Sequence, residues 1–266
     1  MKKAINLYVS PIDNKEKLKM IVEAGFDGIY TGINNSDKSM KLDDIISFAK
    51  NNNFSVPQMH CSYYEPDLVY LWKDGKLGDN LIDDLLNQID ITAKFNIKNF
   101  IIHTCGDFNP PRSLIGIERI EKLLVKCNQY DINLCIENLY DFEQMKYIFD
   151  KIKNKNLKVC YDCGHNNCLN PQDDIFDYFK DKISVLHLHD NHGKPEFGNG
   201  DEHLMLGEGI LNLDDIAKKI SQLDEDIVLC AEYREKYNVD LDYFKRAKKS
   251  LDNLEELILK YKNKKK

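Results

Sequence analysis

Side chains that bind metals or transfer protons stand at the ends of apolar runs along this chain. Imidazoles and carboxylates are ligands that suit zinc, manganese and related divalent ions. Carboxylates can also exchange protons with a substrate. The chain therefore has the side chains for metal-assisted acid–base chemistry. The residues that end or closely follow these runs are His60, His103, Glu137, Asp162, His165, His187, His189, Asp190 and Glu232.

Each of these residues also has a plain structural interpretation. A single histidine near the end of a strand is usually a hydrogen-bonded structural residue, and a terminal Asp or Glu often caps the next helix. All six of the later strand-like runs carry His, Asp or Glu, however, and packing alone explains such a pattern poorly. Several carboxylates buried together are unfavourable unless protons or a cation compensate them. The pattern therefore favours a divalent metal site.

A long polar segment follows His189 and adds two further candidates. It contains Asp201 and His203, two residues apart, and then Gly207-Glu208-Gly209. The Asp-x-His pair would place two more metal ligands over the same site. The alternative is a polar surface loop without a ligand.

Eight short apolar runs alternate with helical stretches. Most runs are continuous rather than alternating, which is typical of parallel strands buried on both faces. Between the runs, apolar residues recur at a spacing of three or four, as in an amphipathic helix, and Asp240 is a candidate N-cap for the last one. The predicted strands are Ala4–Val9, Asp27–Thr31, Ser55–His60, Asn99–Thr104, Asn133–Glu137, Lys158–Asp162, Ser184–His189 and Ile227–Glu232. The predicted helices are Glu16–Ala24, Leu42–Ala49, Leu81–Phe95, Ile115–Cys127, Phe142–Ile152, Ile175–Phe179, Leu213–Leu223 and a last one from Asp240.

Eight strands in strict alternation with eight helices predict a single (β/α)₈ TIM barrel that occupies residues 1–266. No linker rich in Pro, Gly or Ser divides the chain. An open doubly wound sheet is the alternative, but a glycine-rich phosphate loop does not follow the first run. In a parallel barrel all C-terminal strand ends open on one rim, where barrel enzymes place their chemistry. The candidate residues are therefore expected to converge there.

Composition limits the classes of function. The net charge is −7, and only four of the 37 basic residues are arginine, which disfavours a nucleic-acid partner. No apolar run is long enough to span a membrane, and the N-terminus does not have the pattern of a secretory signal. The eight cysteines are then expected to be reduced thiols in a cytoplasmic protein. A zinc or redox role for the Cys160-x-x-Cys163 pair is the weaker interpretation.

The ordered set of motifs resembles the xylose-isomerase-like TIM-barrel superfamily, which includes sugar phosphate isomerases and epimerases and endonuclease IV. The motifs are Ile136-Glu137-Asn138, Tyr161-Asp162-Cys163-Gly164-His165, His187-Leu188-His189-Asp190-Asn191, Asp201-x-His203 with Leu206-Gly207-Glu208-Gly209, and Glu232. In the isomerase branch the resemblance implies that Glu137, Asp162, His187 and Glu232 hold the metal. It also implies that Glu137 and Glu232 act as the acid–base pair, and that His165 orients or stabilises the charged oxygen.

The endonuclease IV branch implies a larger metal site. It would use nine ligands for up to three zinc ions and cleave phosphodiester bonds in abasic DNA. Those nine positions are His60, His103, Glu137, Asp162, His165, His187, Asp201, His203 and Glu232. Because isomerase-like members share much of this pattern, the ligands alone do not separate the two branches.

The acidic net charge favours the isomerase branch. The expected protein is a sugar or sugar phosphate isomerase or epimerase that works through a metal-stabilised enediolate, with one to three Zn²⁺ or Mn²⁺ ions. A metal-binding sensor or scaffold is a third alternative, which the complete acid–base pair disfavours.

The substrate and the oligomeric state stay open, and a homo-oligomer is allowed. The segment from Cys61 to Gly78 is expected to be a lid, and its aromatic residues Tyr63, Tyr64, Tyr70 and Trp72 are expected either to cover a sugar face or to pack on the barrel. The candidate phosphate-binding cations are Lys73, Lys76, Arg112, Lys194 and Arg234.

Overall fold

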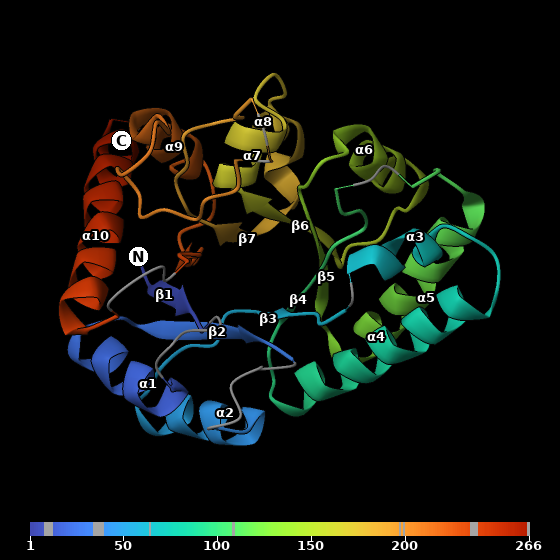
Figure 1. Ribbon diagram of the computed structural model, residues 1–266, viewed down its shortest axis with the longest axis horizontal. Coiled ribbons are helices and arrows are strands. Elements are labelled where there is room, and N and C mark those ends of the chain that lie inside the picture. The colour runs from blue at the N-terminus through green and yellow to red at the C-terminus, as the bar shows by residue number, and fades with distance from the viewer. Residues whose placement is uncertain are drawn as a thin grey trace.

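The computed structural model is a barrel of eight parallel strands with helices around it (Figure 1). It describes residues 1–7, 13–33, 40–63, 65–107, 110–196, 198, 200–234 and 239–264. Hydrogen bonding joins the strands in the order β7-β6-β5-β4-β3-β2-β1-β8. The strands are β1 Lys3–Asn6, β2 Gly28–Gly32, β3 Met59–His60, β4 Asn99–Ile102, β5 Asn133–Glu137, β6 Leu157–Asp162, β7 Ile183–His187 and β8 Leu229–Ala231.

The ring closes between β7 and β8. Leu188 and Ala231 form an isolated parallel bridge, in which Leu188 N–H donates to the Cys230 carbonyl at 2.9 Å. The Glu232 N–H donates in turn to the Leu188 carbonyl at 3.0 Å. Closure removes both sheet edges, and this confirms the predicted (β/α)₈ TIM barrel.

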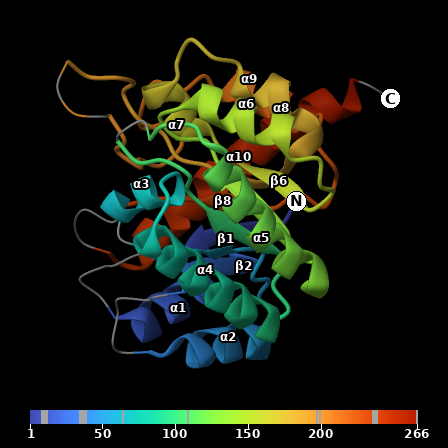
Figure 2. The same cartoon turned by 90° about the vertical axis from the view of Figure 1, so that its right-hand side faces the viewer.

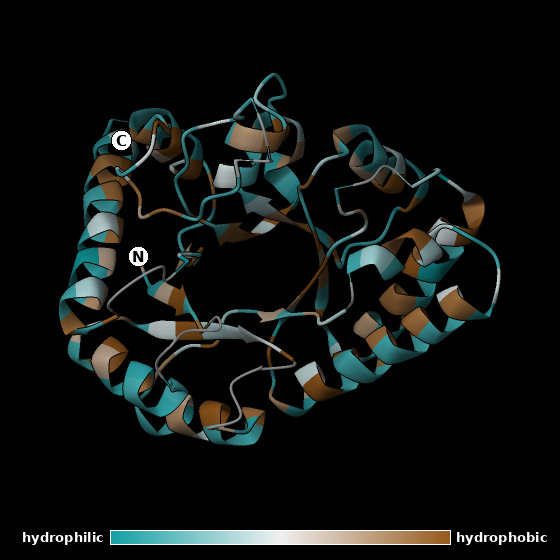
Figure 3. Ribbon diagram, in the orientation of Figure 1, coloured by the Kyte–Doolittle hydropathy of each residue, from teal (hydrophilic) through white to brown (hydrophobic). Residues whose placement is uncertain are grey.

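Helices cover the outside of the barrel, and Figure 2 brings α4 and α5 to the front. Brown apolar residues lie along the helix faces that meet the strands in Figure 3, as the periodicity of the sequence predicts. The α-helices are α1 Asn14–Glu23, α2 Leu42–Asn51, α3 Leu68–Leu71, α4 Lys76–Lys94, α5 Leu114–Tyr130, α6 Phe142–Lys151, α7 Cys163–Leu169, α8 Ile175–Phe179, α9 Leu213–Ile220 and α10 Leu241–Asn263. Two 3₁₀ turns are η1 Glu65–Asp67 and η2 Lys180–Lys182. None of the described helices is both long and apolar enough to cross a bilayer.

Polar N-caps set where several helices begin. The Asp13 carboxylate accepts from the Glu16 N–H before α1, and Ser113 accepts from the Gly116 N–H before α5. Asp240 caps α10 through the Tyr243 N–H, so the predicted N-cap is confirmed. Such caps satisfy backbone donors that the first turn of a helix leaves unpaired.

All eight predicted strands are present, but the alternation with helices is not strict. The helix α7 follows β6 directly, and the short helix α3 precedes α4, so two connections hold two helices each. The third strand keeps only Met59–His60, with a single bridge between Gly28 and Ser55 farther back. The sequence missed α3 and α7 because each is short and has no long apolar stripe.

The segment predicted as a lid is largely packed against the barrel. It contains η1 and α3, and its Trp72 is 1% exposed. The Trp72 indole N–H donates to the Thr104 carbonyl at 2.8 Å. Of the two alternatives for Trp72, the structure shows packing on the barrel, because burial of a large aromatic ring against the wall outweighs exposure. Tyr64 lies outside the described residues.

Candidate functional site

The carboxyl ends of β5, β6, β7 and β8 bring together four side chains, here named the central set. Register pairs Glu137 with Cys160 and Asp162 with His187, so neighbouring strands end at a common level. One ligand atom from each member of the central set lies within 4.8 Å of the others. Cys160, two residues before Asp162, also lies close to Glu137 and His187. The central set consists of Glu137, Asp162, His187 and Glu232.

His187 is the meeting point of the central set. Its Nδ1 lies 3.2 Å from Glu137 Oε1 and 2.5 Å from Glu232 Oε2. Its Nε2 lies 2.8 Å from the side-chain amide of Gln58, which is fully buried. The Gln58 amide can donate to Nε2, or accept from it after a 180° rotation. Gln58 therefore holds the ring so that Nδ1 faces the carboxylates, a role that the sequence pattern did not indicate.

The pKa values of the two glutamates shift in opposite directions. Burial disfavours the charge of Glu137, but the surrounding imidazoles, His187 and His103 first, hold the pKa of Glu137 well below its usual range. Burial raises the pKa of Glu232 to about 8, against a small opposing effect of Arg234. In the metal-free protein the two carboxyls therefore differ in protonation at neutral pH.

Asp162 divides its carboxylate between structure and site. Its Oδ1 accepts from the His165 N–H at 2.7 Å and caps α7. The alternative that this carboxylate caps the following helix therefore holds as well. Its Oδ2 is buried and has no hydrogen-bond partner among the described residues. A buried carboxylate oxygen without a partner is costly unless a cation or proton meets it. The central set thus fits a divalent cation by its three carboxylates, its imidazole and this unpaired oxygen.

Two more histidines approach Glu137 from the other side and are named the histidine pair. His60 Nε2 lies 3.2 Å and His103 Nε2 lies 3.0 Å from Glu137 Oε2. The His60 ring is oriented by a 2.9 Å hydrogen bond from Nδ1 to the Cys61 carbonyl, and the Tyr63 hydroxyl contacts His103 Nδ1. Glu137 therefore uses one oxygen toward the central set and the other toward the histidine pair.

A further group lies beside α7 and is named the loop set. Its ligand atoms also lie within 4.8 Å of one another. The loop that follows β7 supplies two of its members, and β7 and α7 position the others. The loop set consists of His165, His189, Asp201 and His203.

All nine residues that the sequence singled out as metal ligands therefore fall into these three groups. His189 ends the predicted strand Ser184–His189, but the sequence pattern does not assign it as a ligand. Its spacing from His187 was the available signal, because residues two apart on a strand face the same side. The Cys160-x-x-Cys163 thiols are both buried and free.

A cavity lies among the segments that follow β4, β5, β6 and β7, at the mouth of the barrel. It has a volume of about 540 Å³ and is lined by Asp107, Tyr140, Cys168, Leu169, Lys194 and Gly198. Cys168 and Leu169 lie three and four residues after His165, which places one wall of the cavity on the same helix as that imidazole. Of the five predicted phosphate-binding cations, Lys194 is the one that lines this cavity.

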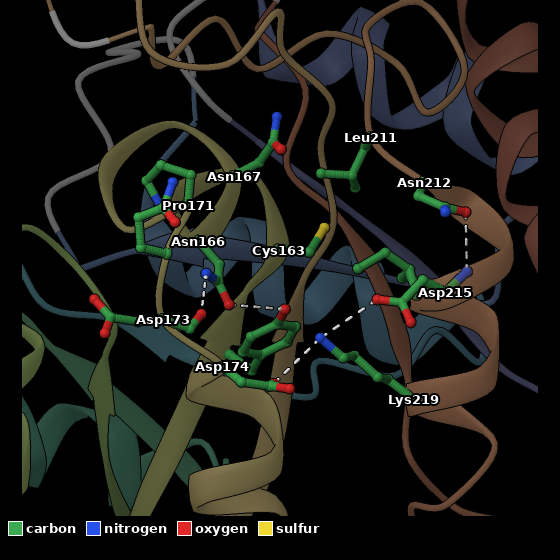
Figure 4. A pocket seen from close by; sticks show the side chains of 13 residues that line it. Cys163, Asn166, Asn167, Pro171, Asp173, Asp174, Leu211, Asn212, Asp215 and Lys219 are labelled. Atoms are coloured by element: carbon green, nitrogen blue, oxygen red, sulfur yellow. Dashed lines mark hydrogen bonds and ion pairs between the residues drawn. The ribbon is translucent and has the colours of Figure 1, made fainter.

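A second cavity lies between α7, the segment before α8, and the start of α9 (Figure 4). Its lysine, Lys219, is 3.2 Å from Asp174 and 3.4 Å from Asp215, so its charges are largely paired within the wall. Asn166 closes another side through bonds to the Tyr161 hydroxyl and the Asp173 carbonyl. The cavity at the mouth is therefore the better candidate for substrate.

Comparisons with known proteins agree with this architecture. The chain is 31% identical over 255 residues to an uncharacterized protein of Methanocaldococcus jannaschii, covering 92% of this chain and 90% of the relative. It is 24% identical over 166 residues to a probable endonuclease 4 of Mycoplasmopsis synoviae, covering 54% and 58%. The structure of a D-tagatose 3-epimerase-like protein matches with a TM-score of 0.79 and 19% identity, over 100% of this chain and 99% of that one. The family described as xylose isomerase-like TIM barrel matches residues 18–257, and the chain belongs to that family.

Proposed function

We propose that this protein is a divalent-metal-dependent isomerase or epimerase of a small sugar or sugar phosphate. The observation that supports this most strongly is the approach of two glutamates to one imidazole nitrogen. Glu137 and Glu232 come from strands that β6 and β7 separate, yet both lie within 3.2 Å of His187 Nδ1. Two carboxylates thus flank the place where a cation and the substrate's reacting carbon would sit.

The chemistry needs a base and an acid on the two sides of a carbon next to a carbonyl. A bound divalent cation would stabilise the negative charge that develops on the substrate oxygens. Glu137 would remove the proton from that carbon, and Glu232 would return one from the opposite side. His165 would donate a hydrogen bond to the charged oxygen. Return to the other face gives an epimer, and return to the neighbouring carbon gives an isomer.

The cavity at the mouth supports a small polar substrate. Its volume of about 540 Å³ lies in the range of small-molecule sites. Asp107 and the Tyr140 side chain offer groups for sugar hydroxyls, and Lys194 offers a cation for a phosphate. These features support a sugar or sugar phosphate rather than a large partner.

Solvent deuterium exchange tests the proposal even when the product is unidentified. The metal-loaded protein is mixed in D₂O with a panel of ketoses and ketose phosphates, and proton NMR follows the C–H beside the carbonyl. We expect exchange with at least one substrate, abolished in Glu137→Gln. Absence of exchange across the panel, with metal bound, would contradict the proposal. Exchange would also exclude the alternative of a non-enzymatic sensor or scaffold.

A metal-dependent phosphodiesterase is the second candidate, and one observation favours it. The carboxylate of Glu137 faces the histidine pair with one oxygen and the central set with the other, as a ligand shared between two cations would. Such a centre can activate water and support a leaving alkoxide. The net charge of −7 disfavours DNA as the substrate.

Incision of a duplex with an abasic site, with zinc present at moderate salt, separates the two candidates. We expect no incision. Zinc-dependent incision that disappears in His103→Ala, while deuterium exchange is absent in the wild type, would reverse the ranking. His103→Ala is informative because His103 contacts Glu137 but lies outside the central set.

A further inference from the structure

We infer that a third cavity, at the N-terminal end of the barrel, binds a nucleoside monophosphate. It is named the basal cavity and lies between residues 149–155, at the end of α6 and the start of the turn to β6, and residues 178–182, which lead into β7. Its volume is about 480 Å³, within the range of small-molecule sites. This inference is separate from the reaction proposed above and does not rest on it.

The basal cavity lies at the opposite end of the strands from the central set. Residues 152–156 come just before β6, and η2 comes just before β7, so the cavity adjoins the first residues of both strands. Asp162 and His187 end the same two strands. The six residues of β6 separate the two ends by roughly 16 Å. A ligand in the basal cavity therefore does not occupy the proposed reaction site.

The inner wall of the basal cavity is apolar and partly aromatic. Phe149, Ile152 and Phe179 line it and are at most 8% exposed, and the two phenylalanine rings lie 4.7 Å apart. Tyr178 also lines it but is 54% exposed, and its ring contacts that of Phe179 in an edge-to-face arrangement at 4.8 Å. An exposed aromatic face that is held in this way can stack on a flat ring of a ligand, such as a nucleobase.

Three lysines add positive charge to this apolar wall. Lys153 donates to the Phe149 carbonyl at 2.8 Å, which holds its ammonium group beside the end of α6. Lys155 and Lys182 line the cavity too, and neither forms an ion pair with a residue that the structure describes. Lys219 in the cavity of Figure 4 differs, because two carboxylates pair with it. The basal cavity therefore has cations that a ligand can use.

The charge of the basal cavity matches one phosphate group. The three lysines are opposed by the Asp150 carboxylate, which also lines the cavity. The carboxyl end of α6 adds about half a negative charge, so roughly 1.5 positive charges remain. A phosphate monoester carries roughly −1.5 to −2 at pH 7. Lysine binds such phosphates as a point charge, which suits a group with several equivalent oxygens.

Two polar side chains favour a nucleotide over a simpler aromatic anion. The Asn154 side-chain oxygen accepts from the Asn156 N–H at 2.9 Å, which leaves the Asn154 NH₂ group as a donor for a ligand. The Asp150 carboxylate can accept from ribose hydroxyls or from an amino group of the base. A nucleoside monophosphate uses the aromatic wall, the lysines and both of these groups together.

Calorimetry with AMP as the probe tests the inference in Lys182→Glu, with Lys50→Glu as the matched control. Lys50 is exposed in the last turn of α2, across the barrel between β2 and β3. We expect AMP to bind the wild type and the control with a Kd below ~1 mM. Binding should weaken at least ~10-fold in Lys182→Glu and about 10-fold in Tyr178→Ala. It should also weaken as salt is raised, because these cations are exposed.

A fluorescence reporter locates the ligand independently of these variants. Tyr178→Trp keeps an aromatic face in the basal cavity, and the natural Trp72 is 1% exposed, so solvent-borne quenchers reach it poorly. AMP should quench the added tryptophan. Adenosine should need at least ~10-fold higher concentrations because it lacks the phosphate, and inorganic phosphate should not quench because it lacks a ring.

Four results would overturn the inference. They are no AMP binding at ~1 mM, equal affinity for AMP in Lys182→Glu and Lys50→Glu, equal affinity of the wild type for AMP and inorganic phosphate, and loss of AMP binding in Lys194→Ala instead. The third would indicate a non-specific anion contact, and the last would place the nucleotide in the cavity at the mouth. The deuterium-exchange test of the proposed function does not involve AMP, so the two proposals can fail separately.

Discussion

Asp190 is expected to anchor the loop that carries Asp201 and His203, and its substitution gives the sharpest stability prediction. The Asp190 carboxylate is 0% exposed and accepts three backbone N–H groups. They come from Asn191 at 2.9 Å, Gly207 at 2.9 Å and Leu211 at 3.0 Å. One side chain thus joins the first and last parts of the loop.

The magnitude follows from these three bonds. Hydrogen bonds to a charged group each contribute ~1.5–3 kcal/mol, and the cost of burying the carboxylate offsets part of the sum. Asp190→Ala should therefore lower the free energy of unfolding by about 4 kcal/mol. For a chain of this size that corresponds to a fall in Tm of roughly 8–16 °C. Asp190→Asn keeps an acceptor oxygen and should lose about half as much.

Urea unfolding followed by circular dichroism measures the change, with Asp226→Ala as the control. Asp226 is exposed, so its removal should change stability by less than ~0.5 kcal/mol. Proteolysis within residues 191–211 should also become faster in Asp190→Ala. If Asp190→Ala unfolds within ~1 kcal/mol of the wild type, the anchoring role is refuted.

Three other predictions concern the site. Glu232→Gln should abolish turnover and weaken metal binding, because Glu232 is both the proposed acid and a proposed metal ligand. A kcat for deuterium exchange near that of the wild type would contradict the mechanism with two acid–base residues. Gly164→Ala should destabilise the fold by ~1–3 kcal/mol, because the added Cβ would clash with His189. The control is Gly32→Ala, whose added Cβ would meet nothing closer than 3.7 Å and should destabilise the fold much less. Thermal unfolding of the two variants measures the difference. In the metal-free protein the pKa of Glu232 in the folded state is about 8, above the ordinary value of 4.5. The contribution of protonated Glu232 to the free energy of unfolding is therefore fully present below pH 4.5 and is lost as the pH rises through 8. Stability of the metal-free protein relative to Glu232→Gln should therefore fall between pH 5 and 8, as urea unfolding over this pH range would show.

The strands could be predicted from the sequence because barrel strands are buried on both faces. Continuous apolar runs such as Asn133–Glu137 match the structure residue for residue. The strand ends were harder to place, since Leu7 and Thr104 continue an apolar run after the ladder has ended. The pattern of burial extends beyond the hydrogen bonds that define a strand.

The helix α7 illustrates what could not be predicted from local pattern. Its residues include Gly164, Asn166 and Asn167, which favour turns over helices in isolation. Tertiary bonds stabilise it instead: Asp162 caps its start, and the Asn166 amide donates to the Asn170 carbonyl at 2.9 Å. Contacts of this kind depend on the fold as a whole.

The candidate site was predictable for the same reason as the strands. Once parallel strands close into a barrel, residues at their carboxyl ends must meet, and the central set does so. His189 could be assigned to a face but not to a partner, because its environment depends on the distant Asp201 and on the space at Gly164. The sequence could not decide between the two alternatives for Trp72, because an aromatic residue in a connecting segment carries no signal of its burial.

The anomalous scattering of manganese in crystals grown with Mn²⁺ is the most decisive check on the proposed metal centre. We expect a peak bonded at ~2.0–2.2 Å to oxygens of Glu137, Asp162 and Glu232 and to His187 Nδ1. The peak should vanish in crystals of Asp162→Ala. A peak elsewhere, or four side chains in the wild type that keep their positions with no ion between them at saturating Mn²⁺, would show that the central set is not a metal site.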